Sequence, residues 1–317
     1  MDQHRARQAI LILAVAGGSL AAAAPADPPL RAARWLAPAA RLTALTREPA
    51  ECLARPESAA AARSIAIGRA AFRAPLLLGG QAARAGLSCS SCHRNGRGNP
   101  DFLFPGISGA PGTADVTASL LSSHRGDGIF NPKPIPDLAG PVGARKVSRD
   151  HGDPALGTFI TGLITLEFDG PQPPPRVLAG VADYVRALSP AACSGDATVP
   201  ITLAAALADI RRALDAAEIA WRARDKAATR LLIGAARSGL GGIDERYALP
   251  GLAEPRARLE EADLSLAAIQ RAIDTDPARV ALRMAAWRGT MQQWTTPLIA
   301  GERESLFDPD LLRARLN

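Results

Sequence analysis

The apolar positions in the second half of the chain, residues 200–317, recur every three to four residues, which is the spacing of amphipathic helices. One apolar stripe spans residues 203–214 and another spans residues 259–273. Such stripes are typical of the core faces of a helical bundle, so we expect antiparallel helices joined by short loops. The predicted helices are residues 203–222, 226–237, 255–273 and 277–294, the last one beginning after Asp276 with a proline in its first turn.

The hydrophobic pattern in the first half is shorter and more often interrupted. A helix is predicted over residues 64–73, where Pro75 ends the pattern. A clear amphipathic helix is predicted over residues 177–188, and a short one over residues 159–164. Between residues 95 and 143, glycine and proline are too frequent for long regular elements, so we expect loops there.

Composition narrows the fold class. Aromatic residues supply only 4% of a chain that is 47% apolar, so its core consists mostly of small aliphatic side chains, which pack most readily as helices. We therefore expect an all-α protein. A length of 317 residues, at about 150 per domain, predicts two domains. The expected organisation is a lead-in segment over residues 27–56, a first domain over 57–196 and a C-terminal helical bundle over 200–317.

The N-terminus has the order of a secretory signal peptide. A basic start is followed by an apolar run and by an alanine tract that ends at Ala26. The apolar run has about twelve strongly apolar residues, too few for a bilayer, which requires about twenty. We expect residues 1–26 to be cleaved and the chain to be exported, most simply to a bacterial periplasm, with no stable membrane span afterwards. The alternative is an anchor that stays attached.

Two of the four cysteines form the sequence Cys89-Ser90-Ser91-Cys92-His93. This is the C-x-x-C-H pattern of covalent c-type haem attachment. Two thiols three positions apart each reach one vinyl group of a haem, and the adjoining imidazole reaches the iron. With four Cys and four His among 317 residues, about 0.0006 accidental matches are expected. We therefore expect Cys89 and Cys92 to hold one haem c and His93 to be the proximal iron ligand.

Two other uses of a C-x-x-C pair were weighed against haem attachment. A thioredoxin-like redox motif requires a βαβ context, and the pattern predicts none. A zinc site requires a second closely spaced ligand pair, which Cys52 and Cys193 do not form. These two cysteines flank the segment with the haem motif. A disulfide between them would tie the ends of one domain together and stabilise it by about 5 kcal/mol in the chain-entropy model.

The net charge of +6 raises the question of a nucleic-acid partner. The basic residues are nearly all Arg and alternate with Asp and Glu rather than clustering, which disfavours nucleic-acid binding. An acidic redox partner protein is consistent with the same excess of positive charge, because complementary charges speed the association of two proteins.

Two further elements carry a family resemblance. The segment from Gly68 to Phe72 and the stretch Val181-Ala-Asp-Tyr184 resemble the G-x-x-x-aromatic and L-x-x-aromatic elements of class I c-type cytochromes, in which two helices cross tightly. The stretch over residues 68–93 is also similar to bacterial dihaem cytochrome c peroxidases. The resemblance covers about residues 60 to 190. It implies a class I cytochrome c-like domain, with a single attachment motif where a dihaem enzyme has two.

The second axial ligand is not fixed by the motif. Class I carriers use Met, but no Met occurs between Met1 and Met284. We favour His124 as the distal ligand. The alternatives are His151, Met284 or Met291 from the bundle, and an open or water-filled site. A bis-His iron has a lower potential than a His/Met iron.

These observations predict an exported monohaem cytochrome that transfers single electrons. One alternative is a peroxidase-like enzyme acting on a small oxidant at an open iron site, with His124, Arg125 or Glu167 moving protons or stabilising charge. Another is a haem-bearing subunit whose bundle docks a partner redox enzyme. A surface ion pair is the simpler reading of Arg125 and Glu167.

Overall fold

The structure is a computed structural model that describes residues 30–316 with the exception of 125, 142–145 and 194–196. The predicted signal peptide, residues 1–26, lies outside the described residues. The described chain is mostly helical with a few short strands, which confirms the all-α expectation at the level of helical content. No helix in this part of the chain combines the length and apolarity needed to cross a bilayer.

The first half is arranged around two long helices, α2 (Ala59–Phe72) and α7 (Pro175–Ala187). The α2 helix begins five residues earlier than the sequence pattern predicted. Ser58 caps it, because its Oγ accepts the Ala61 N–H at 3.1 Å. The shorter elements around the pair are α1 (Arg41–Thr46), α3 (Pro75–Leu78), α4 (Gly80–Ala85), α5 (Cys89–Cys92), the 3₁₀ turn η3 (Arg94–Gly96) and α6 (Ala155–Gly162).

The two long helices cross in direct backbone contact. A β-carbon placed on Gly68 would lie 1.8 Å from the carbonyl oxygen of Gly180, so neither helix has room for a side chain at the crossing. Beside it, the rings of Phe72 and Tyr184 pack with their centroids 5.1 Å apart. This is the tight crossing that the resemblance implies for the two segments.

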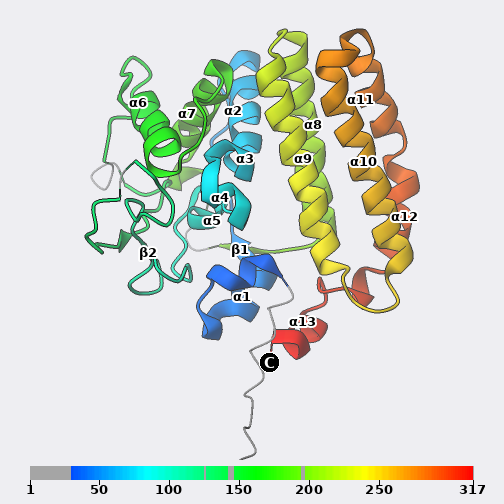
Figure 1. Ribbon diagram of the computed structural model, residues 1–317, viewed down its shortest axis with the longest axis horizontal. Coiled ribbons are helices and arrows are strands. Elements are labelled where there is room, and N and C mark those ends of the chain that lie inside the picture. The colour runs from blue at the N-terminus through cyan, green and yellow to red at the C-terminus, as the bar shows by residue number, and fades with distance from the viewer. Residues whose placement is uncertain (1–29, 125, 142–145, 194–196, 317) are drawn as a thin grey trace, which may run out of the picture.

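The predicted loop region wraps one side of this pair (Figure 1), and its described residues include one short antiparallel ladder, β2 (Thr113–Ala114) with β3 (Lys133–Pro134). It is nevertheless anchored, because Phe102, Ile107 and Leu121 are buried in the core. The predicted helix over 159–164 is longer than expected. It starts as α6 and continues as a π-helical turn, η5 (Leu163–Glu167).

The second half consists of long helices that lie side by side (Figure 1). Its helices are α8 (Leu203–Arg222), α9 (Lys226–Arg246), α10 (Ala253–Thr275), α11 (Val280–Gly289) and α12 (Met291–Ala300). The α9 helix continues past the predicted end at residue 237, since burial of Leu240 and Ile243 outweighs the cost of its glycines. The predicted helix over 277–294 is instead divided into a 3₁₀ turn, α11 and α12, with a break at Thr290.

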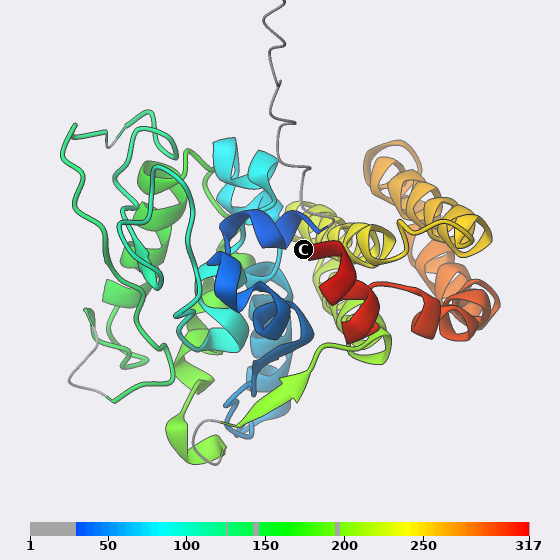
Figure 2. The ribbon, with the colours of Figure 1, turned by 90° about the horizontal axis from the view of Figure 1, so that it is seen from below.

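The halves share one cluster of buried apolar side chains, and α2 and α3 pack against the bundle helices α8 and α9. The lead-in segment is folded as well. Its strand β1 (Arg47–Pro49) pairs antiparallel with β4 (Thr198–Pro200), and α1 contacts the C-terminal α13 (Pro309–Leu316), as the view from below shows (Figure 2). The first and last described segments therefore close the same face of the molecule.

A partly buried ion network also joins the lead-in, α2 and the bundle. Glu51 accepts from Arg69 Nε at 2.7 Å, from Arg73 Nη2 at 3.1 Å and from the hydroxyl of Tyr184 at 2.7 Å. Arg69 Nη1 also reaches Asp209 of α8 at 2.7 Å. Burial raises the pKa of Glu51, but Arg73 and Arg69 outweigh it and hold the pKa below its ordinary value. The ionised form of Glu51 is therefore stabilised by the two arginines that surround its carboxylate.

Candidate haem-attachment site

The two cysteines of the C-x-x-C-H motif lie on the single helical turn α5. Ser88 and Ser91 form a reciprocal capping box, in which the Ser88 N–H donates to Ser91 Oγ at 3.0 Å, so the two serines of this segment stabilise the turn. Residues three apart on a helix share a face, which places the Cys89 and Cys92 side chains together. Both are free thiols, and burial raises the pKa of each to about 12, so they are protonated at neutral pH.

The ring of His93 is oriented by the loop region. His93 directly follows α5, and its Nδ1 lies 3.0 Å from the carbonyl oxygen of Pro136. A carbonyl only accepts, so Nδ1 carries the proton and Nε2 keeps its lone pair. Burial lowers the pKa of His93 to about 4, which keeps the ring neutral at physiological pH. Metal-ligating histidines almost always donate their other ring N–H in this way, to a carboxylate, a backbone carbonyl or water.

The crossing of α2 and α7 places an aromatic side chain next to His93. Phe72, at the end of α2, lies with its ring centroid 6.4 Å from that of His93 and also packs on Tyr184 of α7. The crossing at Gly68 therefore fixes the aromatic side chains next to the motif.

The residues present fit a covalently attached haem. Two unpaired thiols lie on one helical turn, partly exposed and packed against the apolar core. The neighbouring imidazole has one nitrogen anchored and the other available. These are the donors that a c-type haem uses.

The alternative uses of the pair find no support in the described residues. The strands described there form only two-stranded antiparallel ladders, without the parallel strands of a βαβ unit. Nor does the described part of the chain contain a group of three or more His, Cys, Asp or Glu that could hold a metal ion.

Cys52 and Cys193 are disulfide-bonded, with Cα atoms 5.1 Å apart, so the pairing that the sequence left as a hypothesis is present. The bond joins the segment after β1 to the segment before β4. It therefore links the beginning of the first half of the chain to its end. Because both sulfurs are in the disulfide, neither cysteine can bind a zinc ion.

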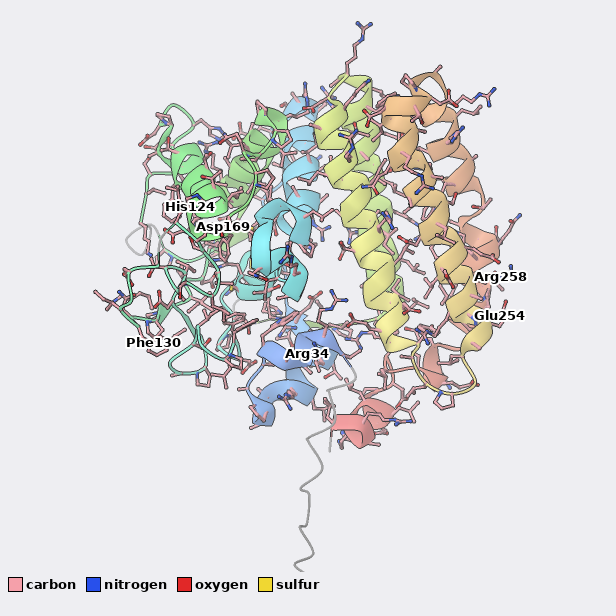
Figure 3. All side chains as sticks on the ribbon, viewed as in Figure 1. Arg34, His124, Phe130, Asp169, Glu254 and Arg258 are labelled. Carbon is pink, nitrogen blue, oxygen red and sulfur yellow. A yellow bond between two sulfur atoms is a disulfide. The ribbon has the colours of Figure 1, made fainter. Side chains whose placement is uncertain are left out.

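His124 is held on an exposed loop by Asp169. Its Nδ1 lies 2.8 Å from Asp169 Oδ1, and the Ser123 N–H donates to Asp169 Oδ2 at 2.8 Å (Figure 3). The hydrogen bond to His124 is the first of several that lower the pKa of Asp169. The His124 side chain is 58% exposed and its Nε2 is the nitrogen left for a metal. Its distal role stays a prediction.

The other candidates for the distal position lie in different surroundings. His151 is exposed and lines a groove of about 610 Å³ between α6 and α7. Met284 and Met291 are buried in the bundle, on α11 and α12. Glu167 is buried at the end of η5, not on the surface, and Arg125 lies outside the described residues.

Sequence reasoning found the thiols and the imidazole but missed what orients them. Pro136 acts through its backbone carbonyl, which has no signature in a sequence. Asp169 precedes a glycine in an unremarkable turn, although its φ of +55° is uncommon for a residue with a side chain. Nothing in the sequence links Asp169 to His124, which lies 45 residues earlier.

Comparison of the chain with family models, with curated proteins and with solved structures found no match.

Proposed function

We propose that this protein is a monohaem c-type cytochrome that transfers single electrons. Cys89 and Cys92 would hold the haem through thioether bonds and His93 would ligate the iron through Nε2. The observation that carries the proposal is the 3.0 Å contact between His93 Nδ1 and the Pro136 carbonyl, beside two free thiols. The attached haem supplies a one-electron couple, and the chain supplies its position and surroundings.

The chain's own residues prepare the ligand. Donation from Nδ1–H to a carbonyl makes Nε2 a stronger electron donor, which favours the ferric state. The pKa of about 4 means that protons do not compete for Nε2 at neutral pH. The crossing of α2 and α7 holds Phe72 against the ring, so the imidazole has little freedom to rotate.

The hydrogen bond between His124 and Asp169 supports His124 as the distal ligand. Asp169 fixes the Nδ1 side of the ring, so Nε2 is presented in one tautomer. We therefore propose bis-His ligation, with a lower potential than a His/Met site would have, and a role as an electron carrier. An open distal site would favour the peroxidase-like alternative, although the single attachment motif argues against it.

Export is part of the proposal. The Cys52–Cys193 disulfide supports an oxidising compartment such as a periplasm, because such bonds are rare in reducing cytosol. An acidic protein is the proposed redox partner, on the basis of the net charge of +6. Residues 200–317 pack on the haem-bearing half through α8 and α9, so a docking role for the bundle would act close to that half.

The test is expression of the full chain in a host that matures c-type cytochromes. We expect a coloured protein whose intact mass exceeds the bare chain by one haem, also after denaturation. A Cys89→Ser/Cys92→Ser double variant is the matched control, since serine keeps the size but forms no thioether. A colourless wild-type protein with the mass of the bare chain would overturn the proposal.

A further inference from the structure

The carbonyl that binds His93 belongs to a short turn over residues 136–140. The Asp137 carboxylate accepts the Ala139 N–H at 2.8 Å, and the Gly140 N–H donates to the Asp137 carbonyl at 3.0 Å. Pro136 itself has a fixed φ. The position of the Pro136 oxygen therefore depends on how firmly Asp137 is held.

Arg97 holds Asp137 from the segment that follows the haem motif. Its Nε donates to Asp137 Oδ2 at 2.7 Å. The Arg97 side chain is 18% exposed, so water screens this pair only in part. On another side of the turn, Arg149 Nη1 donates to the Leu138 carbonyl at 2.5 Å. The turn is therefore held between two guanidinium groups.

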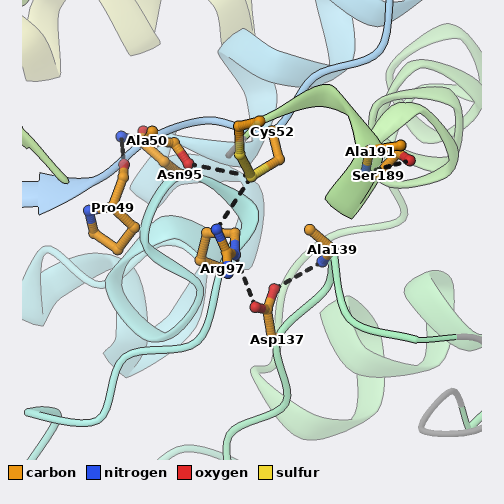
Figure 4. The surroundings of a disulfide bond; sticks show 10 residues. Pro49, Ala50, Cys52, Asn95, Arg97, Asp137, Ala139, Ser189 and Ala191 are labelled. Atoms are coloured by element: carbon orange, nitrogen blue, oxygen red, sulfur yellow. Dashed lines mark hydrogen bonds and ion pairs between the residues drawn. A yellow bond between two sulfur atoms is a disulfide. The ribbon is translucent and has the colours of Figure 1, made fainter. Parts of the chain in front are cut away.

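The disulfide holds Arg97 in turn. Arg97 Nη1 lies 3.1 Å from Cys52 Sγ, and the two contacts of the guanidinium form a continuous chain from the disulfide to the turn (Figure 4). A sulfur is a weak acceptor, so this contact orients the group more than it binds it. The planar guanidinium uses two of its donors in fixed directions, which an ammonium group does not match.

We infer that Arg97 is a positioning residue for the proximal ligand: through Asp137 it holds the Pro136 carbonyl against His93, and the Cys52–Cys193 disulfide orients Arg97. The inference rests on the proposed function, because it concerns the axial histidine of the proposed haem. It adds that the iron potential depends on a residue that touches neither the iron nor His93.

A simpler role for Arg97 makes the opposite prediction. If Arg97 acted only as a nearby positive charge, its removal would favour the ferric state and lower the potential. If Arg97 positions the turn, its removal weakens the hydrogen bond from His93, makes Nε2 a poorer donor and raises the potential. The sign of the shift therefore separates the two roles.

The experiment measures the midpoint potential of the full-length holoprotein and of its Arg97→Gln and Arg97→Lys variants. We expect the potential of Arg97→Lys to rise, with the ferric-to-ferrous ratio at the wild-type midpoint falling about ten-fold, which is 59 mV for a one-electron couple. The potential of Arg97→Gln should rise by less, because the lost positive charge acts in the opposite direction. Arg97→Lys keeps the charge, so a charge-only role predicts no shift for it. Arg94→Gln is the matched control, because Arg94 bonds the carbonyls of Ala44 and Arg47 and not the turn. Its potential should fall, as loss of a charge predicts.

A second measurement does not depend on the potential. In nitrogen-15-edited spectra of the reduced holoprotein, the His93 Nδ1–H should exchange with solvent about ten-fold faster in Arg97→Gln than in wild type. Unchanged exchange together with a lowered or unchanged potential would overturn the inference and leave the proposed function standing. A wild-type protein without covalent haem would overturn both, and its mass and lack of colour identify that case before any variant is measured.

Discussion

Gly68 of α2 and Gly180 of α7 meet so closely that a β-carbon on the first would lie 1.8 Å from the carbonyl oxygen of the second. We expect Gly68→Ala to lower the free energy of unfolding by about 3 kcal/mol or more, because the obstacle is backbone and cannot move aside. Gly157→Ala on α6 is the control, since nothing lies within 4 Å of that β-carbon. It should raise stability by about 0.5 kcal/mol. Denaturant unfolding of the two variants measures both free energies of unfolding. Equal values would contradict the close backbone contact of α2 and α7.

The charge of Glu51 should contribute to stability. Glu51→Gln should lower the free energy of unfolding by about 3 kcal/mol at pH 7, because it leaves Arg69 and Arg73 in a partly buried site with only the more exposed carboxylate of Asp209 as an ionic partner. Glu254→Gln is the matched control. Its carboxylate pairs with Arg258 on the exposed surface, and we expect no measurable change (Figure 3).

The same carboxylate predicts a pH dependence. The folded-state pKa of Glu51 lies below its ordinary value of 4.5, so its contribution is complete above that pH. It is lost as the pH falls below 4.5 and through the folded-state pKa. Unfolding measured from pH 7 to pH 2 should therefore show wild type approaching Glu51→Gln in acid. A constant difference between the free energies of unfolding of the two proteins over this range would show that the charge of Glu51 does not contribute to stability.

Thiol alkylation should distinguish the two cysteine pairs. In the denatured haem-bearing protein, no cysteine should react before reduction, and Cys52 and Cys193 should react after it. If no haem is attached, Cys89 and Cys92 react without reduction. The intact mass of the alkylated protein shows how many cysteines have reacted. The free energy of unfolding of the Cys52→Ser/Cys193→Ser variant should also be lower, by about 5 kcal/mol in the chain-entropy model for a separation of 141 residues.

His124 should determine the spin state of the iron. We expect a low-spin ferric spectrum in wild type and a high-spin spectrum in His124→Ala, because the distal position loses its nitrogen ligand. Asp169→Asn should weaken the low-spin signature without abolishing it, since the ring loses the carboxylate that fixes its tautomer. His151→Ala is the matched control. A low-spin spectrum that persists in His124→Ala would exclude His124 as distal ligand.

Much of the helical framework was predictable because periodicity reports burial directly. The α8 helix has the predicted bounds, residues 203–222, since its apolar stripe is regular and uninterrupted. The end of α9 was missed because Gly239, Gly241 and Gly242 lower local helix propensity, while buried neighbours on the same helix keep it intact. The break at Thr290 was missed for the opposite reason: the apolar pattern continues across it although the backbone does not.

The candidate site was predictable to the extent that its residues are adjacent in sequence. Cys89, Cys92 and His93 form a contiguous motif whose spacing has a chemical reason. Arg97 and Asp137 are 40 residues apart, and nothing in either segment indicates the other. Contacts of this kind depend on the path of a loop, which single-sequence patterns do not encode.

The β1–β4 ladder and the disulfide join the same two stretches, one near residue 50 and one near residue 195. On the proposed function, a chain exported with its N-terminus first would present Cys89 and His93 before Cys193 emerges. During that interval the disulfide could not yet close this half of the chain. The proposed haem would therefore be added before the two stretches are joined.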